Sequence, residues 1–524
     1  MFNKERMSIT LQKPQIYRLL RLGCVLCIGF LMSCSQPSAE AATTTYYVSP
    51  TGKDTQNGTI HSPWKTLQHA ADTVPAGSTV YLRKGVYKQQ LAITRSGSAS
   101  KGNITFTHYP SEQAVLDGTG QAVDGLQGMI DIQNASYITI KGLEIRNYTT
   151  THADQVPAGI SVQGAGSHIQ IVGNQIHDIK STVSLSGNHA TGRDAHGIAV
   201  YGNKAPESLH DITIDHNELY NLVLGSSESL VVNGNVEKFT ISHNVLHDND
   251  NIGIDVIGYE GTAPDVKYDV ARQGVIKGNT IYNISSNRNP FYGKKIPNNS
   301  NSAGAIYVDG GKDTIIEQNK VYNNDIGIEI ASEHAGKSTD NITVRSNIIF
   351  SNRLTGIAMG GYDTERGSTT NSHIINNTLY KNDTLNRGNG QLYVQYDTRN
   401  NIIKNNIMVA GASNVLIYNE YTKNSGNVID YNLYNAPDGS AEATWIWKNK
   451  EYTGFANNQK RSGNDVHSLF ANPKLVDPAK QNFHLQQSSP AINKGIADPS
   501  IVGTRDMDGE LRQSQSPINI GADQ

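Results

Sequence analysis

The sequence predicts an all-β fold, a right-handed parallel β-helix that builds one coil from each sequence repeat. Three observations support this prediction: an asparagine recurs every 26 to 43 residues, a short glycine-bounded apolar segment precedes it, and no useful helical stretch separates the copies. The recurring residues are Asn174, Asn217, Asn244, Asn279, Asn319, Asn347, Asn377, Asn406 and Asn432. A unit of just under thirty residues, lengthened by insertions in some copies, is typical of a solenoid.

The apolar segments have the pattern of short β-strands. Gly-Ile-Ala-Val-Tyr-Gly (197–202), Gly-Ile-Asp-Val-Ile-Gly (253–258) and Ala-Ile-Tyr-Val-Asp-Gly (305–310) all place aliphatic, mostly β-branched residues at positions two and four. A period of two with glycine at the boundaries predicts a strand that buries one face. With two or three such strands in each repeat, the repeats form the successive coils of a helix of strands.

The recurring asparagines are predicted to be structural. An asparagine at one turn of every coil can hydrogen-bond its neighbours above and below, and it tolerates the left-handed backbone of a turn. A second column follows three residues later and consists of His177, Tyr220, His247, Tyr282, Tyr322, Phe350 and Tyr380. We interpret this column as a stacked aromatic file, so that its histidines are structural rather than catalytic.

The N-terminal segment predicts export. Arg18 and Arg21 precede an apolar run at 22–32, which is too short to span a bilayer and has the length of a signal-peptide core. Leu-Met-Ser-Cys at 31–34 resembles the lipobox of bacterial lipoproteins, which implies lipidation of Cys34 and a membrane anchor. Cleavage near Ala41 and release as an extracellular or periplasmic protein is the alternative.

We expect residues 1–34 to be a lipoprotein-type signal peptide and 35–45 a tether. An N-terminal cap with the first coils occupies 46–125, the β-helix core 126–440, and further coils or a packed cap 441–524. All three cysteines lie in the first 34 residues, so the body has no disulfide framework and no cysteine zinc site. The net charge of −3 argues against a nucleic-acid partner. We expect a monomer.

Both ends of the mature chain resemble known proteins. Tyr-Tyr-Val-Ser-Pro-Thr-Gly-Lys-Asp at 46–54, Pro-Trp-Lys-Thr-Leu at 63–67 and Ser-Pro-Ala-Ile-Asn-Lys-Gly at 489–495 resemble secreted bacterial β-helix proteins of the pectate-lyase-like superfamily. The resemblance covers nearly the whole mature chain and implies the architecture. It does not imply one reaction, because this fold hosts lyases, hydrolases, epimerases and non-enzymatic adhesins.

Polar residues crowd onto the outward face of three adjacent strands. Outward positions recur about 4.8 Å apart in successive coils, and most of them are small or neutral here. Asp255, Tyr307, Asp309 and Glu329 break this pattern on consecutive coils. We therefore predict the functional site on these coils.

Two insertions flank the same strands. The coil that begins at Gly253 takes 26 residues to reach its asparagine, where 14 or 15 is usual, and a second insertion occupies 285–302. Long loops on a rigid scaffold commonly form the walls of a binding groove. The catalytic candidates are Tyr307, Asp255, Asp309, Arg272 and Lys267, and the substrate-binding candidates are Tyr259, Glu329, Lys294, Lys295, His334, Asp363, Arg366 and Tyr393.

These residue types suit a lyase that acts on an acidic polysaccharide. Removing the proton beside a uronate carboxylate requires a cation on the carboxylate and a base such as Lys, Arg or Tyr. Tyr307 stands at the centre of the cluster as candidate base. Basic loop residues would bind the acidic chain.

Within the superfamily, the closest resemblance is to calcium-dependent pectate lyases. Glu228 matches an acid just before one strand, and Asn-Ile-Gly-Ile-Asp at 251–255 matches an acidic motif on the next coil. The resemblance implies a Ca²⁺ site at Glu228, Asn251 and Asp255. Tyr307 stands where these lyases have their base lysine, a role that tyrosine plays in related alginate-type lyases.

Two other functions remain open. Asp255, Asp309 and Glu329 on adjacent rungs would suit a glycoside hydrolase if a carboxylate pair lies about 5 Å or about 6.5 to 9.5 Å apart. The sequence lacks the Asn-Thr-Asp and Gly-His-Gly signatures of β-helix polygalacturonases. The third possibility is a surface protein that binds a polysaccharide without cleaving it.

Overall fold

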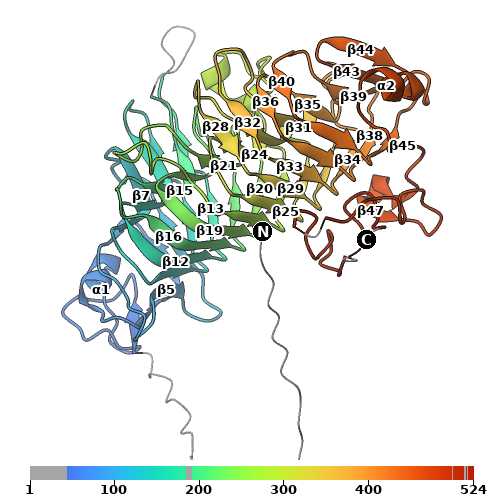
Figure 1. Ribbon diagram of the computed structural model, residues 1–524. Coiled ribbons are helices and arrows are strands. Elements are labelled where there is room, and N and C mark those ends of the chain that lie inside the picture. Colours follow the sequence, from blue (N-terminus) through green and yellow to red (C-terminus); the bar gives the residue numbers. More distant parts are fainter. Residues whose placement is uncertain (1–43, 185–191, 499, 513–514, 516) are drawn as a thin grey trace, which may run out of the picture. The chain divides into compact units, whose positions relative to one another are not determined.

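The computed structural model describes residues 44–524, apart from 185–191, 499, 513–514 and 516. The predicted signal peptide, the lipidation site Cys34 and nearly all of the predicted tether lie outside the described residues. Within the described part, no helix is both long and apolar enough to cross a membrane. Strands dominate the chain, and coils follow one another in sequence order (Figure 1).

Three long sheets run along the stack of coils, which confirms the predicted right-handed parallel β-helix. The first sheet contains β1 (Thr45–Val48), β2 (Thr79–Leu82), β5 (Ile104–His108), β8 (Ile138–Lys141), β12 (Gly166–Val172), β16 (Leu209–Asp215), β19 (Val236–Ser242), β22 (Val275–Lys277), β25 (Ile315–Glu317), β29 (Thr343–Arg345), β33 (His373–Ile375), β37 (Ile402–Lys404) and β41 (Val428–Asp430). The second sheet contains β3 (Gly85–Tyr87), β6 (Ala114–Asp117), β9 (Glu144–Arg146), β13 (Gln175–His177), β17 (Glu218–Tyr220), β20 (Val245–His247), β23 (Thr280–Tyr282), β26 (Lys320–Tyr322), β30 (Ile348–Phe350), β34 (Thr378–Tyr380), β38 (Ile407–Val409), β42 (Leu433–Asn435) and β45 (Leu469–Phe470).

The third sheet, called the site sheet below, contains the predicted glycine-bounded strands. Its members are β4 (Leu91–Ile93), β7 (Leu126–Gln133), β11 (Val156–Gln163), β15 (His196–Gly202), β18 (Leu230–Gly234), β21 (Ile254–Ile257), β24 (Gly304–Asp309), β27 (Ile326–Ala331), β31 (Thr355–Met359), β35 (Leu392–Val394), β39 (Val415–Tyr418), β43 (Thr444–Trp447) and β44 (Lys450–Thr453). All pairs are parallel except β43 with β44. One coil therefore consists of a site-sheet strand, a first-sheet strand and a second-sheet strand.

Smaller elements complete the fold. They are the two-stranded β10 (Thr149–Thr150) and β14 (Lys180–Ser181), the four-stranded β28 (Ser338–Asp340), β32 (Ser368–Thr370), β36 (Thr398–Arg399) and β40 (Asn424–Ser425), the hairpin β46 (Leu475–Asp477) and β47 (Asn482–Leu485), the helices α1 (Leu67–Thr73) and α2 (Phe455–Arg461), and three 3₁₀ turns at Ser286–Arg288, Pro290–Tyr292 and Pro478–Lys480. Helix α1 starts after Thr66, whose side chain accepts a hydrogen bond from the backbone N–H of His69. Its buried face packs on β4 at the first coils.

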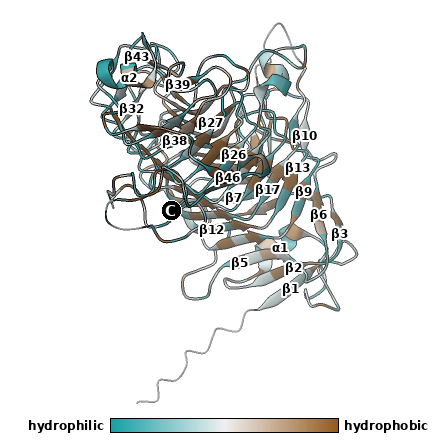
Figure 2. Cartoon of the chain, turned by 90° about the vertical axis from the view of Figure 1, so that its right-hand side faces the viewer, coloured by the Kyte–Doolittle hydropathy of each residue, from teal (hydrophilic) through white to brown (hydrophobic). Residues whose placement is uncertain are grey.

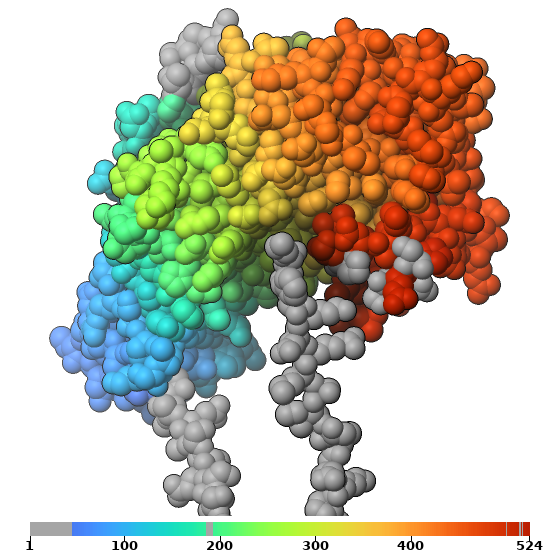
Figure 3. Space-filling view, viewed as in Figure 1, coloured from blue at the N-terminus to red at the C-terminus, as the bar shows by residue number. Residues whose placement is uncertain are grey.

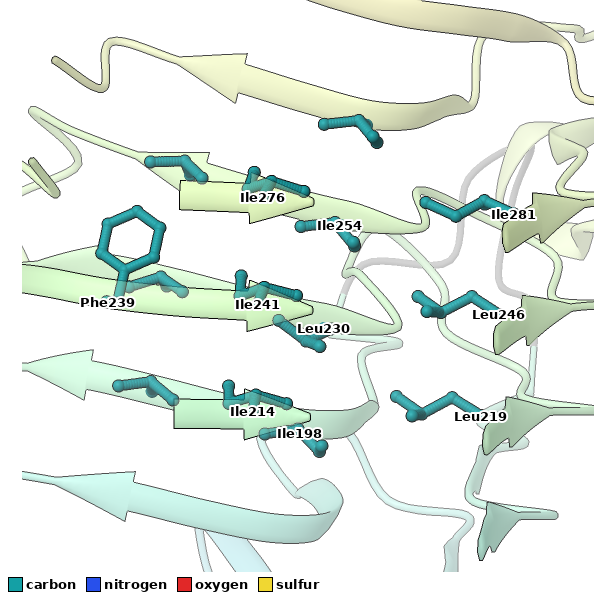
Figure 4. Close-up of a cluster of buried hydrophobic side chains, with 14 of the residues drawn as sticks. Ile198, Ile214, Leu219, Leu230, Phe239, Ile241, Leu246, Ile254, Ile276 and Ile281 are labelled. Atoms are coloured by element: carbon teal, nitrogen blue, oxygen red, sulfur yellow. The ribbon is translucent and has the colours of Figure 1, made fainter. Parts of the chain in front are cut away.

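The core consists of columns of aliphatic side chains, and each coil contributes one residue to each column. Ile198, Leu230 and Ile254 are partners on consecutive strands of the site sheet, and equivalent columns rise from the other two sheets (Figure 4). In Figure 2, brown hydrophobic segments concentrate on the stacked strands. Each added coil thus buries the apolar face of its predecessor, which lets the core grow with the number of repeats.

The asparagine ladder forms as predicted. Asn347 donates from its backbone N–H and from Nδ2 to Oδ1 of Asn377, at 3.1 and 2.9 Å, and its own Oδ1 receives the same two bonds from Asn319. Its Nδ2 also donates to the carbonyl of Ile316 at 2.9 Å. The amide is therefore saturated inside the stack, as a buried polar group must be.

The prediction that these asparagines occupy the left-handed region is wrong. The residue before each asparagine does so instead, as at His216, Gln318 and Ser346 with φ of 54°, 59° and 54°. The left-handed residue makes the sharp turn. The asparagine that follows it therefore stays outside the left-handed region, and its side-chain amide hydrogen-bonds the next coil.

The aromatic file also forms, from His177 through Tyr220, His247, Tyr282 and Tyr322 to Phe350, with ring centroids 4.7 to 5.2 Å apart. Tyr380 does not continue it. Phe483 of the C-terminal segment contacts both Phe350 and Tyr380, at 4.9 and 5.6 Å. Leu475 and Phe483, which follow β45, pack on second-sheet residues such as Phe350 and Val409, and Arg512 donates to Oγ of Ser346. In Figure 3, the red C-terminal part of the chain lies against the later coils.

We expect Asn347→Ala to lower the free energy of unfolding by about 2 to 3 kcal/mol, because the backbone N–H of Asn319 and the carbonyl of Ile316 both lose a buried partner. Chemical denaturation followed by circular dichroism measures this change. The matched control is Asn57→Ala at an exposed position, which should stay within about 0.5 kcal/mol of the parent. Equal stability of the two variants would contradict a structural role for the ladder.

Candidate functional site

The predicted polar residues share the outward face of the site sheet. Asp255 on β21 is the strand partner of Tyr307 on β24, and Tyr307 is in turn the partner of Glu329 on β27. Asp309 lies two residues after Tyr307 on the same face. Although they point away from the core, all four side chains are at most 6% exposed. The flanking loops cover this part of the sheet.

The loops contribute further carboxylates. Glu228 precedes β18, Glu260 follows β21 and Glu333 follows β27. The Tyr307 hydroxyl donates to Oε1 of Glu333 at 3.2 Å, and the Glu333 backbone N–H donates to Oδ1 of Asp309 at 2.7 Å. Nδ2 of Asn233 donates to Oε2 of Glu260 at 2.7 Å. We call Glu228, Asp255, Glu260, Asp309, Glu329 and Glu333 the acidic cluster.

The acidic cluster has no matching positive charge. Among the described residues, none of its carboxylates forms an ion pair with lysine or arginine. The nearest nitrogen bases are His196, 3.6 Å from Glu228, and His334, 3.9 Å from Asp309. Burial lowers the pKa of His196 to about 4, so this side chain is neutral. Oδ1 of Asp255 is buried without any hydrogen-bond donor.

This arrangement shifts the ionisation of the whole cluster. Burial, followed by the neighbouring carboxylates Glu228 and Asp309, raises the pKa of Asp255 well above its usual range. The pKa values of Glu228 and Asp309 rise for the same reasons, and burial beside Glu333 raises the pKa of Glu329 to about 8. Burial and four nearby acids also raise the pKa of the Tyr307 phenol. The cluster therefore holds either protons or a bound cation.

Two carboxylates of the acidic cluster and a neighbouring histidine have the spacing of metal ligands. One ligand atom each from Glu260, Asp309 and His334 lies within 4.8 Å of the others. Nε2 of His334 is buried without a hydrogen-bond partner. These three ligand atoms fit a divalent cation, which would also supply countercharge to the neighbouring carboxylates.

The three residues predicted to hold Ca²⁺ have different surroundings. Asp255 keeps a free oxygen, as described above. The Asn251 amide is already engaged, since Nδ2 donates to the carbonyl of Ser227 at 2.9 Å and Oδ1 accepts from Tyr292 at 3.4 Å. Glu228 is buried beside His196.

Among the predicted basic residues, His334 lies 3.9 Å from Asp309, and Nη1 of Arg366 lies 3.5 Å from the backbone carbonyl of Glu333. The other predicted basic residues form no ion pair with the acidic cluster. Arg272 donates to Oε2 of Glu237 at 2.8 Å and to Oδ1 of Asn235 at 3.1 Å, beside the first sheet. The Lys267 ammonium lies over the ring of Tyr268. The side chains of Lys294 and Lys295 are exposed on their loop.

The remaining loop candidates lie directly after strands of the site sheet: Tyr259 follows β21, and Asp363 and Arg366 follow β31. The Lys337 ammonium lies over the Tyr259 ring, 4.9 Å from the ring centroid. The Arg366 guanidinium lies 4.6 Å from the ring of Tyr362, and its Nε is 3.6 Å from Asp363.

A pocket of about 480 Å³ opens beside Tyr307, on the side of the later coils. Tyr393, Glu329 and Glu333 line it together with Tyr292 and Gln395. The sequence pattern does not single out these last two residues as site residues. Tyr292 lies within the predicted insertion at 285–302, whereas Gln395 occupies an outward position after β35, where a neutral side chain gives no signal.

Comparisons with known proteins support the architecture. Residues 46–210 match the family described as Pel9A-like, right handed beta helix region. The chain is 42% identical over 465 residues to the uncharacterized protein YwoF of Bacillus subtilis (strain 168), covering 88% of this chain and 95% of that protein. It is 37% identical over 113 residues to pectate lyase PEL9 of Emericella nidulans, covering 19% of this chain and 27% of that enzyme.

Among solved structures, pectate lyase Pel9A is similar at 15% identity with a TM-score of 0.48, covering 92% of this chain and 97% of that chain. The structure of XylC with xylose is similar at 13% identity with a TM-score of 0.49, covering 91% and 98%.

The cation-free protein should lose stability as the pH rises. Glu329 has a pKa of about 8 when folded and 4.5 as its ordinary value, so between these limits the folded state binds more protons than the unfolded state. Its contribution is full below about pH 4.5 and is lost as the pH rises to about 8, by on the order of 5 kcal/mol at about 1.4 kcal/mol per pKa unit. Thermal melts in buffers with chelator across this range measure the decline.

The variant Glu329→Gln should flatten this decline, because it removes the titrating carboxyl. Glu442→Gln, at an exposed position, provides the matched control and should keep the parent profile. A parent melting temperature that rises across the same range would contradict a buried, uncompensated cluster.

Proposed function

Because this chain belongs to the same β-helix family as YwoF of Bacillus subtilis, within the pectate-lyase-like superfamily, we propose that it is a polysaccharide lyase acting on a uronate-containing polysaccharide. One observation carries this proposal: a tyrosine hydroxyl lies inside a buried carboxylate cluster to which the described residues supply no lysine or arginine partner. A polymeric substrate is met outside the cell, which agrees with the predicted export signal at 1–34.

The reaction requires positive charge beside the substrate. The proton at C5 of a uronate becomes acidic only when the adjacent carboxylate is neutralised. Glu260, Asp309 and His334 would hold a divalent cation. Such a cation, with Ca²⁺ favoured by the oxygen ligands, would supply the charge that neutralises the uronate.

Tyr307 and Glu333 would act together as the base. The phenol oxygen takes the C5 proton while its own proton passes to Oε1 of Glu333, to which the hydroxyl already donates. The electron pair of the C5–H bond forms the C4–C5 double bond, and the C4–O bond breaks. This relay avoids a free tyrosinate, which the raised pKa of Tyr307 disfavours.

Glu329 would protonate the leaving group. Its pKa of about 8 keeps it protonated at neutral pH, and it is the strand partner of Tyr307. Its carboxyl has no hydrogen bond or ion pair among the described residues and borders the pocket. The proton can therefore go to the departing O4 as the bond breaks.

A glycoside hydrolase is the second candidate, and the same Glu329 favours it. A protonated carboxyl next to ionisable carboxylates is the arrangement that glycoside hydrolysis uses. The two reactions give different products, since only elimination leaves an unsaturated, ultraviolet-absorbing end. New reducing ends without that absorbance would therefore identify the hydrolase.

We expect Tyr307→Phe to lower kcat on a cleaved uronate polymer by at least about 100-fold, the usual size of a general-base contribution. Ultraviolet absorbance of the product, with pectate, alginate and glucuronan as trial substrates, measures the rate. The matched control Tyr81→Phe removes a hydroxyl remote from the site and should leave kcat unchanged. Retained activity in folded Tyr307→Phe would exclude Tyr307 as the base.

Calcium chloride titrated calorimetrically into the chelator-treated protein should give one saturable binding event. We expect Asp309→Asn to weaken it at least about tenfold, because a buried anionic ligand is lost. The exposed Asp124→Asn serves as control. A parent protein that binds no Ca²⁺ and turns over substrate in chelator would remove the cation from the proposal.

A further inference from the structure

Two histidines on consecutive coils share one carboxylate at the corner between the first and the second sheet. His216 lies between β16 and β17, and His243 lies between β19 and β20. Nδ1 of His216 is 2.5 Å from Oδ2 of Asp215, and Nδ1 of His243 is 3.0 Å from Oδ1 of the same carboxylate. The two imidazole rings are stacked, with their centroids 4.9 Å apart. None of the three residues belongs to the acidic cluster or lines the pocket beside Tyr307.

The backbone at this corner places the two rings next to each other. Both histidines occupy the left-handed position before a ladder asparagine, with φ of 54° and 52°. The coils on either side have Gly173 and Gly278 at the same position. A Cβ at Gly278 would meet the ring of His243 at 2.9 Å, whereas a Cβ at Gly173 would meet nothing within 4 Å. The first glycine-bearing coil therefore leaves open space beside His216, and the second makes room for the ring of His243.

The three side chains have the composition and spacing of ligands for a transition metal. One ligand atom each from Asp215, His216 and His243 lies within 4.8 Å of the others. Imidazole nitrogens suit Zn²⁺, Cu²⁺ and Ni²⁺, whereas Ca²⁺ prefers a set of oxygen ligands. The side chains of His216 and His243 are 64% and 48% exposed. Water can therefore complete the coordination of an ion held by these three groups.

The charges around the carboxylate also favour a cation. Among the described residues, Asp215 forms ion pairs only with these two histidines, and neither lysine nor arginine lies within ion-pair distance of it. In the metal-free protein, each Nδ1 needs a proton to donate to the carboxylate. A metal ion would replace these two protons, because its ligands are ionised carboxylates and neutral imidazoles.

We propose that Asp215, His216 and His243 bind one transition-metal ion of the Zn²⁺ class. The ion is held by Nδ1 of both rings and by the shared carboxylate, with water in the remaining positions. Since β16 and β19 are neighbouring strands (Figure 1) and Asp215 and His243 are 28 residues apart in the chain, the ion links two consecutive coils. This site is separate from the cation proposed for the acidic cluster, and it does not depend on the proposed lyase function.

Zinc chloride titrated calorimetrically into the chelator-treated and dialysed protein tests the site, with Ca²⁺ present in excess to compete at the acidic cluster. We expect His216→Asn and His243→Asn each to weaken one Zn²⁺ binding event at least about tenfold. Both variants should fold, because asparagine takes the same left-handed position at Asn376 and Asn405. The matched control is His210→Asn, which removes an imidazole that lies 2.6 Å from a single aspartate and has no third ligand nearby. This control should bind Zn²⁺ as the parent does.

Zn²⁺ should also raise the melting temperature of the parent and of His210→Asn more than that of the two corner variants, since an ion that binds only the folded state stabilises it. Circular dichroism confirms that each variant is folded. A parent protein that binds no Zn²⁺, or folded corner variants that bind Zn²⁺ as tightly as the parent, would overturn the site. Cleavage of a polysaccharide enters neither measurement, so failure of the lyase proposal would leave this result unaffected.

Discussion

The stacking of one coil on the next, in a fixed register, is the constraint on which the rest of this structure depends. Backbone hydrogen bonds along three parallel sheets set the spacing, and the buried asparagine ladder prevents a coil from sliding relative to its neighbour. A slip of one residue would turn every outward side chain into the core. The register therefore also determines which outward residues become neighbours, and it places Asp255, Tyr307 and Glu329 on consecutive rungs.

That rigid placement makes an otherwise unfavourable cluster tolerable. Carboxylates brought together under covering loops, without lysine or arginine partners, repel one another and resist ionisation. A flexible scaffold would relax by turning them to solvent, whereas strands fixed on both sides by neighbouring coils cannot. A group of residues whose placement is locally unfavourable, in a fold that the rest of the sequence favours, is expected at a functional site. The asparagine ladder and the aliphatic columns stabilise the fold and so offset the unfavourable burial of these carboxylates.

Much of the fold followed from periodicity in the sequence. The boundaries of the glycine-bounded segments 253–258 and 305–310 fall within two residues of the boundaries of the observed strands β21 and β24. The adjacency of Asp255 and Tyr307 was equally predictable, because one strand per repeat makes equivalent positions neighbours. The position of the left-handed residue was not, since asparagine is favoured both in that conformation and in a buried ladder. Only the structure separates the two roles.

The sequence by itself determined the repeat, the strand pattern and the rungs that carry the polar residues, because each of these is encoded within a single repeat. Tertiary structure decided where the loops and the C-terminal segment go. It turned Arg272 toward Glu237, brought Glu333 to the Tyr307 hydroxyl and placed Phe483 between Phe350 and Tyr380. The physical reason is that these contacts join segments without shared periodicity. Their direction depends on which partner is within reach once the coils have stacked.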